Sequence, residues 1–477
     1  MAEFFPAGDP RNWFSRKRYG LFVHWGIYSV GGIHEQEEAR FRRSKAEYER
    51  YAAEFNPQKF NPAEWLDMAE ECGMEYLVFT AKHHDGFCMW DTRETNFNIM
   101  NTPHGKDVLG MLAEECHKRN FPLVLYYSCV DWHEPSYPNI GRHHEIMTDP
   151  AKHDMNRYME FLKRQIHELC TRYGTIHGFW WDQNVPEWQD VSVNAMIRQL
   201  QPQAVINNRG YDNSGDFSTP ERNYQTLSAT PFTSPTEACD SVGMNSWGYR
   251  KEEDYFSVLK LERQIAAYQS LGGNFLLNAG PKPDGRFPVE AVRILKGIGT
   301  WYRKVRSALT ASPCAEAPFF CDKLAVTVSA DRKELYLILL APPDGEALTL
   351  KGLGVLPESA VWLNTDESLP VTLDPTPYMP DGAVWLRIRK LPAERMTGEI
   401  PVIRLEFSEP VRFGPLFTGN GENSGAEENF PAVAVPVPDG PDYPHFCSGC
   451  GLEWKRSPFM TMPAPRLPYS MTDTGIH

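Results

Sequence analysis

One carboxylate stands out because of its neighbours. Asp182 ends the stretch Gly178-Phe-Trp-Trp-Asp182, and turn residues such as Pro186 follow it. The pattern predicts a buried strand over residues 176–181 with an acid at its carboxyl end. In a barrel of parallel strands those ends face the ligand. Aromatic faces pack on the C–H surface of a sugar, and carboxylates bond its hydroxyls or attack its anomeric carbon, so the pattern indicates carbohydrate chemistry. An aspartate that caps a helix or pairs with a core arginine is the alternative.

Polar residues also end the other predicted strands. Each of five consecutive strands finishes on a histidine, tyrosine, aspartate or arginine, a run that core packing does not explain. These residues are His24 after the first strand, His83 and His84 after the second, Tyr126 on the third, Trp180 and Asp182 on the fourth, and Arg209 after the fifth. The run predicts a functional mouth at one end of a barrel.

Glycoside hydrolysis requires two carboxyl groups, one to attack or to activate water and one to protonate the leaving oxygen. Asp182 is the candidate nucleophile, because Arg209 and the histidines would keep it ionised. The acid should lie on another loop of the same mouth. Glu221 and Glu237 both qualify, and their spacing does not decide between them.

Sequence motifs for metal sites and for other kinds of active site are weak or absent. The first strand has no His-x-His, and the adjacent His83 and His84 are expected to point to opposite faces of a strand, which argues against a metal site. Cys447-Ser-Gly-Cys450 is a single C-x-x-C without a second pair. No Gly-x-Ser-x-Gly elbow, phosphate loop or dinucleotide fingerprint is found. We therefore expect no metal and no organic cofactor.

The elements that would position these residues alternate along the chain. Near-continuous apolar runs predict parallel strands over residues 20–24, 76–80, 123–127, 176–181, 204–206 and 274–277. Helical patterns lie between or after them, over residues 61–72, 107–119, 151–173, 255–271 and 289–305. This order predicts an α/β fold, a (β/α)8-like (TIM-type) catalytic barrel over residues 1–310, with one or two strands irregular or not recognised.

The pattern changes after the barrel. Short β-type runs separated by turns predict an all-β sandwich over residues 311–407. Residues 408–477 are rich in proline and glycine, so we expect an irregular tail.

Composition restricts the partners. A net charge of −14 argues against nucleic-acid binding, and no apolar run approaches the roughly 20 residues that span a bilayer. The first residues lack a basic and a long apolar region, and the ten cysteines are scattered singly. These features predict a cytoplasmic protein with reduced thiols, whereas a leader removed from the chain would leave secretion open. The oligomeric state stays open.

Several motifs together resemble one known family. They are Tyr19-Gly-Leu-Phe-Val-His-Trp-Gly-Ile-Tyr-Ser-Val30, Lys82-His-His-Asp-Gly-Phe-Cys-Met-Trp-Asp91, Leu125-Tyr-Tyr-Ser128, Phe179-Trp-Trp-Asp182, Asn208-Arg-Gly210 and Ser246-Trp-Gly-Tyr249. From about residue 13 to residue 407 the chain resembles the α-L-fucosidases of glycoside hydrolase family 29. The resemblance implies a retaining exo-hydrolase without cofactor, built as a barrel plus a β-sandwich. Its substrates would be fucosylated oligosaccharides or glycoconjugates with terminal α-L-fucose.

The resemblance also implies roles for single residues. Asp182 matches the family nucleophile, and the pocket-lining residues match His24, His83, His84, Tyr126, Trp180 and Arg209. The family's pocket glutamate matches Glu35, although Gln36 stands where the family usually has tryptophan. The acid/base matches Glu221 or, by the alternative placement, Glu237. Glu221 is favoured because its short tether to Arg209 should hold it near the mouth.

Two other functions are compatible with the motifs. One is a retaining hydrolase of another sugar, such as an α-galactoside, and the other is a fucose-binding protein that has lost catalysis. Loops around the mouth, among them residues 137–144 and 226–244, are expected to determine linkage and leaving group.

Overall fold

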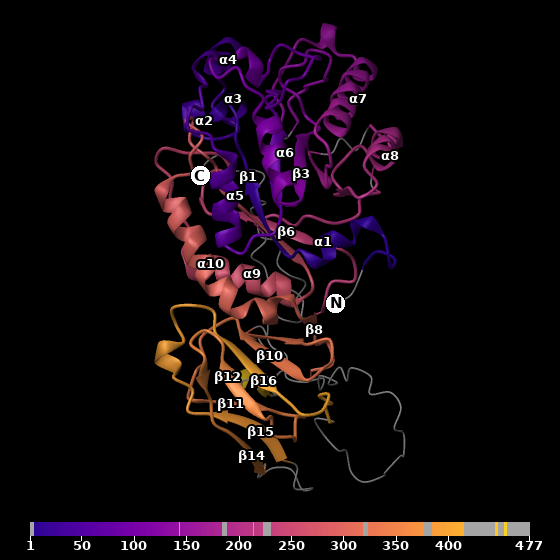
Figure 1. Ribbon diagram of the computed structural model, residues 1–477. Coiled ribbons are helices and arrows are strands. Elements are labelled where there is room, and N and C mark those ends of the chain that lie inside the picture. Colours follow the sequence, from indigo (N-terminus) through magenta and orange to yellow (C-terminus); the bar gives the residue numbers. More distant parts are fainter. Residues whose placement is uncertain are drawn as a thin grey trace. The chain divides into compact units, whose positions relative to one another are not determined.

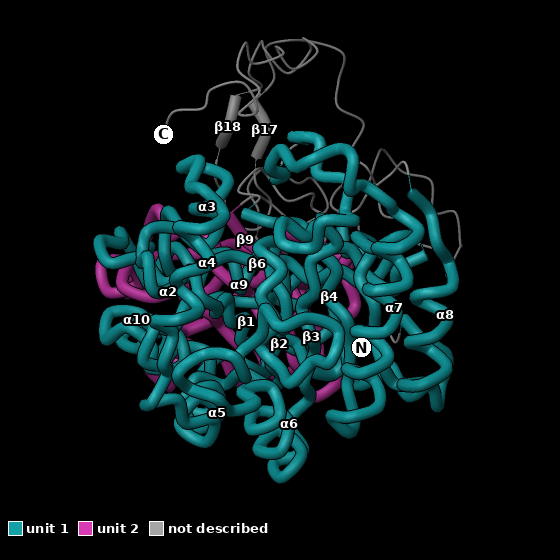
Figure 2. Tube along the Cα trace, turned by 90° about the horizontal axis from the view of Figure 1, so that it is seen from above, with its two compact units in different colours: residues 1–312 teal, residues 313–477 magenta. Residues whose placement is uncertain are grey.

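The computed structural model describes residues 4–142, 144–183, 188–212, 214–222, 230–317, 323–375, 384–414, 444–446 and 453–455. The chain divides into two compact units, residues 1–312 and 313–477, which Figure 2 shows in two colours. This division lies close to the boundary predicted at residue 310.

The first unit is built on a parallel sheet of seven strands in the order β5-β4-β3-β2-β1-β7-β6. Strands β1, β3 and β6 of this sheet are labelled in Figure 1. Every residue of these strands is buried, as expected for parallel strands covered on both faces. The strands are β1 (Tyr19–Val23), β2 (Leu77–Lys82), β3 (Leu123–Ser128), β4 (Gly178–Asp182), β5 (Val205–Ile206), β6 (Glu237–Ser241) and β7 (Asn274–Asn278).

An irregular segment, residues 217–221, links the two edge strands. Parallel bridges join Asn207 beyond β5 to Phe217, and Glu221 to Cys239 of β6. The backbone N–H of Cys239 donates to the carbonyl of Pro220 at 3.0 Å. Pro220 itself has no N–H to donate, which is one reason why this segment forms isolated bridges rather than a regular strand. The segment takes the place of an eighth strand, and the (β/α)8-like barrel is confirmed.

The sequence analysis missed strand β6. Its residues, Glu237-Ala-Cys-Asp-Ser241, are mostly polar, whereas apolar runs were the signal for the other strands. Here the buried polar groups are bonded inside the protein, as when Lys260 donates to Asp240 at 2.6 Å. All of β6 therefore lies within residues 226–244, which the sequence analysis assigns to a loop at the mouth.

Ten α-helices are described around and beside this sheet. Side-chain caps start several of them: Asn61 accepts from the N–H of Ala63, and Asp154 from that of Arg157. Because Asp154 is the cap, its helix starts later than the predicted residue 151. The helices are α1 (Trp13–Arg16), α2 (Tyr28–Gly31), α3 (Glu37–Arg40), α4 (Lys45–Glu54), α5 (Pro62–Glu71), α6 (Val108–Lys118), α7 (Met155–Arg172), α8 (Val191–Leu200), α9 (Val258–Ser270) and α10 (Val289–Thr310). Across the described residues, none is long and apolar enough to cross a membrane.

The second unit is the predicted β-sandwich. Its larger sheet has the order β13-β12-β16-β10-β9-β8, and its smaller sheet the order β11-β15-β14. Leu337 and Leu405 of the larger sheet share one apolar core with Leu350 and Leu386 of the smaller. The strands are β8 (Ser312–Pro313), β9 (Leu324–Val328), β10 (Glu334–Leu339), β11 (Ala347–Leu350), β12 (Ser359–Trp362), β13 (Glu367–Ser368), β14 (Val371–Pro375), β15 (Val384–Arg389) and β16 (Val402–Glu406).

The tail departs from the expected irregular chain in one place. Two short strands, β17 (Pro444–Phe446) and β18 (Glu453–Lys455), pair antiparallel. Each contains an aromatic residue, which favours extended backbone. Cys447 and Cys450 lie outside the described residues.

Candidate active site

Asp182 is the last residue of β4 and lies among hydrogen-bond donors. The hydroxyl of Tyr126 on β3 donates to its Oδ2 at 2.7 Å. Its Oδ1 accepts from Nη1 of Arg209 at 3.2 Å and from the backbone N–H of Gln183 at 2.9 Å. Nε2 of His84 lies 3.7 Å from Oδ2. The carboxylate is thus oriented by groups from four different parts of the chain.

These neighbours determine the charge of Asp182. Burial raises its pKa, but the nearby His84 and Arg209 and the hydrogen bond from Tyr126 outweigh burial. The pKa of Asp182 therefore lies below the ordinary aspartate value, and the group is an anion at neutral pH.

Arg209 also contacts a second carboxylate. The guanidinium lies over the ring of Trp180, 4.9 Å from its centroid, and Nη2 donates to the carbonyl of Thr219 at 2.6 Å. Nη1, which bonds Asp182, also donates to Oε1 of Glu221. Two oxygen atoms bonded to one nitrogen lie no farther apart than about 6 Å. The closing segment of the barrel thus brings Glu221 close to Asp182.

Glu221 differs from Asp182 in exposure and pKa. Its side chain is 36% exposed, against 12% for Asp182. Partial burial and the negative charge of Asp182 raise its pKa, and Arg209 offsets only part of this rise. Two neighbouring carboxyls with opposite pKa shifts are suited to acid and base roles.

Glu237 lies elsewhere in the barrel. It is the first residue of β6, paired in register with Asn274, the first residue of β7, and it is 1% exposed. Its carboxylate accepts from the hydroxyl of Tyr76 at 2.5 Å and from Nε1 of Trp180 at 3.0 Å. Burial raises its pKa to about 7, although both hydrogen bonds oppose the rise. Glu237 is bonded inside the barrel, at the end opposite to the mouth.

His83 and His84 do not point to opposite faces of a strand, as the sequence analysis expected. Strand β2 ends at Lys82, so the two histidines follow in a turn and do not alternate across a strand. Their rings lie 4.1 Å apart. The ring of His83 stacks on Tyr126 at 5.7 Å and lies 5.8 Å from that of His24. Both histidines therefore belong to the same cluster.

Ser128 determines the tautomer of His84. The hydroxyl of Ser128 lies 2.7 Å from the carbonyl of Val130 and 2.7 Å from Nδ1 of His84. A carbonyl cannot donate, so the hydroxyl must give its proton to Val130 and accept from Nδ1. In neutral His84 the proton is therefore on Nδ1, and Nε2, the nitrogen near Asp182, is a hydrogen-bond acceptor.

Asn278 at the end of β7 orients His24 in the same way. Its Nδ2 donates to the carbonyl of Trp247 at 2.7 Å, so its Oδ1 accepts from Nδ1 of His24 at 2.8 Å. Burial lowers the pKa of His24 to about 4, which keeps the ring neutral with its proton on Nδ1. The sequence analysis singled out neither Ser128 nor Asn278, although both lie at strand ends.

Glu35 joins the cluster indirectly. It is 1% exposed, and it accepts from the hydroxyl of Ser246 at 2.6 Å and from the backbone N–H of Trp247 at 3.0 Å. Burial opposes ionisation, but His34 and the bond from Ser246 lower the pKa of Glu35 to about 2. Glu35 thus holds the indole of Trp247, which lies 5.3 Å from the ring of His24. Gln36 instead accepts from Arg40 and from His144.

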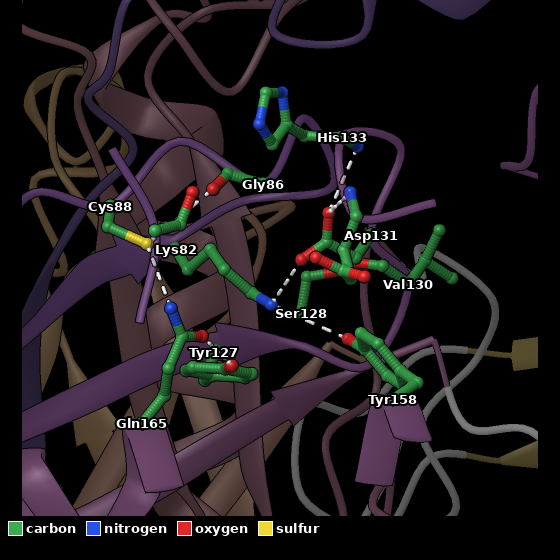
Figure 3. A network of polar contacts seen from close by, with 12 residues as sticks. Lys82, Gly86, Cys88, Tyr127, Ser128, Val130, Asp131, His133, Tyr158 and Gln165 are labelled. Carbon is green, nitrogen blue, oxygen red and sulfur yellow. Dashed lines mark hydrogen bonds and ion pairs between the residues drawn. The ribbon is translucent and has the colours of Figure 1, made fainter. Parts of the chain in front are cut away.

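A buried ion pair supports the turns that carry the histidines (Figure 3). Nζ of Lys82 donates to Oδ2 of Asp131 at 2.7 Å, and Oδ1 of Asp131 accepts from the N–H of His133 at 3.0 Å. The N–H of Trp132 in turn donates to the carbonyl of His84 at 2.8 Å. The pair therefore joins the turn after β2 to the turn after β3. Across the described residues, no group of His, Cys, Asp or Glu side chains has an arrangement that could hold a metal ion.

Comparisons with known proteins agree with this arrangement. A family model described as alpha-L-fucosidase matches residues 7–306. The tissue alpha-L-fucosidase of Rattus norvegicus is 29% identical over 388 residues, which cover 72% of this chain and 80% of that protein. The Homo sapiens tissue enzyme is 28% identical over 372 residues, 71% of this chain and 77% of its own length.

Solved structures show the same similarity. Alpha-L-fucosidase isoenzyme 1 from Paenibacillus thiaminolyticus superposes with a TM-score of 0.73 at 28% identity, covering 84% of this chain and 99% of its own. An alpha-L-fucosidase from Bacteroides thetaiotaomicron, solved as a covalent intermediate with 2-fluoro-fucosyl fluoride, has a TM-score of 0.71 at 27% identity, covering 83% and 96%. Since the family model spans more than half of the sequence, this chain belongs to the alpha-L-fucosidase family.

Proposed function

We propose that the barrel hydrolyses terminal α-L-fucosides of oligosaccharides or glycoconjugates with retention of configuration, with Asp182 as nucleophile and Glu221 as acid/base. The observation that carries this assignment is the Arg209 nitrogen bonded to both carboxylates. An upper limit of about 6 Å between these two oxygens is compatible with the roughly 5–5.5 Å of retaining pairs and lies below the roughly 6.5–9.5 Å of inverting pairs.

The reaction proceeds in two displacements. In the first, an Asp182 oxygen forms an ester bond to the anomeric carbon, while the bond to the leaving oxygen breaks and that oxygen takes the proton of Glu221. In the second, Glu221 takes a proton from water, and the water oxygen displaces Asp182 from the anomeric carbon. Arg209 and the hydroxyl of Tyr126 stabilise the Asp182 carboxylate as leaving group.

The pKa shifts fit these roles. Asp182 must be ionised to attack, and its pKa is lowered. Glu221 must carry a proton to donate, and its pKa is raised. When Asp182 is esterified it loses its charge, so the pKa of Glu221 falls, as the change from acid to base requires.

The histidines account for sugar recognition. His24 has its proton on Nδ1, and so has His84 in its neutral form, and each then offers Nε2 as an acceptor to a sugar hydroxyl. The half-buried indole of Trp247 provides apolar surface for C–H groups of the ring, whereas Trp180 is 1% exposed and supports Arg209 and Tyr126 from below the sugar site. A hydroxyl-rich ring with one apolar edge, such as a 6-deoxysugar, suits this combination.

The test measures hydrolysis of aryl α-L-fucoside and aryl α-D-galactoside by the full chain. We expect turnover of the fucoside, α-L-fucose as the first product seen by NMR, and a galactoside rate lower by orders of magnitude. Initial release of β-L-fucose would disprove retention. Comparable galactoside turnover would favour the other sugar, and binding of fucose without hydrolysis of the aryl fucoside would favour an inactive binding protein.

The predicted cytoplasmic location stays a prediction. Every cysteine that the structure describes is free and buried, which accords with reduced thiols without identifying a compartment.

A further inference from the structure

A groove of about 770 Å³ lies in the barrel unit outside the cluster described above. Its walls come from residues 38–45, which run from α3 into α4, and from two stretches that follow β3. The residues that matter here are Glu38, Arg42, Lys45, Trp132, Met147 and Lys152. We refer to it as the basic groove.

The basic groove adjoins the catalytic cluster through one indole. Trp132 lines the groove, and its ring lies 5.6 Å from that of His84. His84 in turn lies 3.7 Å from Asp182. The Trp132 indole N–H donates to the carbonyl of His144 at 2.9 Å, which fixes this dividing wall. One buried indole therefore contacts both the groove and the catalytic cluster.

Glu38 is a largely buried carboxyl on the wall of the groove. It is 4% exposed, it lines the groove, and within the described residues its carboxyl has no hydrogen bond. Burial, helped by the negative charge of Asp85, raises its pKa to about 8. Buried polar groups are nearly always hydrogen-bonded, so a carboxyl that faces the groove without a bond to a described residue can bond water or a polar ligand there. A protonated carboxyl can both donate to and accept from sugar hydroxyls.

The groove is basic although the chain as a whole is acidic, with a net charge of −14. Arg43 is paired with Glu37, and Lys45 lies 3.6 Å from Glu49. Arg42 and Lys152 also line the groove, and neither has an ion pair with a described residue. Two acids line the groove as well: Glu145, which is paired with Arg142, and Asp149, which has no ion pair with a described residue. Arg42 and Lys152 outnumber this one carboxylate, which favours a ligand that carries a negative charge.

Apolar side chains flank the same groove. Met147 lines it and is 72% exposed, and its bridge partner Ile140 is 54% exposed. Phe41, next to Arg42 in the chain, is 57% exposed. Exposed apolar groups beside cations and a neutral carboxyl match the mixed surface of a pyranose with a charged substituent.

We propose that the basic groove binds a second sugar of the fucosylated glycan, one that carries an anionic group such as a carboxylate or a sulfate ester. Arg42 and Lys152 contact the anion, and Glu38 bonds hydroxyls of the same sugar. This inference rests on the proposed function, because it presumes that a fucose residue occupies the cluster at Asp182.

The first experiment compares kcat/KM for three versions of one fucosylated oligosaccharide: neutral, sulfated, and extended with a sialic acid carboxylate. At low ionic strength we expect at least one anionic version to exceed the neutral one by about tenfold, and added salt to reduce the difference. The substrate with the higher kcat/KM shows whether the groove prefers a sulfate ester or a carboxylate. Equal values for all three would overturn the proposal.

Variants then locate the effect. Arg42→Ala with Lys152→Ala should abolish the preference for the anionic substrate and leave the aryl α-L-fucoside unchanged. The matched control, Lys118→Ala with Arg293→Ala, removes two exposed cations from α6 and α10 and should keep the preference. A preference lost equally in both double variants, or kept in both, would contradict the site.

Glu38 supplies a third comparison. Glu38→Gln keeps a neutral hydrogen-bonding group and should change KM for the preferred oligosaccharide by less than about twofold, whereas Glu38→Leu should raise it by about five- to tenfold. Thermal unfolding of both variants separates binding from folding. Equal KM values for Gln and Leu would exclude Glu38 from the ligand contact. If the parent protein fails on the aryl fucoside, the proposed function fails; if it succeeds without an anion preference, only this inference fails.

Discussion

Two carboxyls at opposite ends of one barrel have raised pKa values for different reasons. Glu221 at the mouth is 36% exposed in its side chain, shares Arg209 with Asp182 and has a nearby anion. Glu237 at the other end is 1% exposed and accepts from Tyr76 and Trp180, without a cation partner among the described residues. A raised pKa alone does not identify a catalytic acid. The features that favour Glu221 over Glu237 as the acid are its exposure to the ligand and its position beside the proposed nucleophile, Asp182.

The largest loss of activity is expected when Asp182, the proposed nucleophile, is replaced. Asp182→Ala should lower kcat/KM for an aryl α-L-fucoside by roughly 10⁴–10⁶-fold, because no other group can form the ester bond. Circular dichroism and thermal unfolding should show an intact fold. Activity within tenfold of that of the parent would show that Asp182 is not the nucleophile.

Glu221→Ala tests whether Glu221 or Glu237 is the acid, because loss of the acid lowers the rate most for substrates with poor leaving groups. We expect a loss of about 10²–10⁴-fold for fucosides with poor leaving groups and a much smaller loss for a dinitrophenyl fucoside, which needs no acid. Azide should restore turnover and give fucosyl azide. Glu237→Gln serves as the control and should show neither behaviour. Azide rescue of a Glu237→Ala variant, with none for Glu221→Ala, would reverse the two roles.

Ser128→Ala tests the tautomer of His84. Loss of the acceptor at Nδ1 lets the proton move to Nε2, so that His84 no longer accepts from the sugar. KM should rise by about three- to tenfold with a smaller change in kcat. The ¹⁵N NMR signals of His84 should show the proton shared between the two nitrogens, a readout that simple loss of packing does not produce. Unchanged signals together with a raised KM would exclude this explanation.

Glu237→Gln should change stability more than activity. Burial raises the folded pKa of Glu237 to about 7, above its value of about 4.5 in the unfolded chain. Between these pH values unfolding releases a proton, so the parent loses stability as pH rises from about 4.5 to 7, by roughly 2–4 kcal/mol from this group. The variant lacks that loss and should gain stability relative to the parent between pH 5 and pH 8 in denaturant unfolding. A constant difference across that range would show that Glu237 is not buried as an acid.

Much of the barrel could be predicted because most of its strands are apolar runs. Those runs end on His24, Tyr126 and Asp182, and parallel strands place their ends together whatever the details of packing. Strand β6 was missed because its polar residues are stabilised by contacts that only the folded chain brings together. For the same reason, residues 226–244 were expected to be a loop.

The arrangement within the site was harder to predict. Glu221 and Glu237 both follow β5 in the chain, and only the closure of the barrel through residues 217–221 sends them to opposite ends. His83 and His84 were expected on opposite faces, but β2 ends one residue before them. The roles of Ser128 and Asn278 depend on which atom donates, and sequence spacing carries no information on donors and acceptors.

The most direct test asks which residue becomes covalently bound to the sugar. The full chain is incubated with 2-deoxy-2-fluoro-α-L-fucosyl fluoride, digested and mapped by mass spectrometry. We expect one fluorofucosyl group per chain, attached to Asp182, and loss of activity in step with labelling. A label on any other residue, or inactivation without a label, would contradict the account.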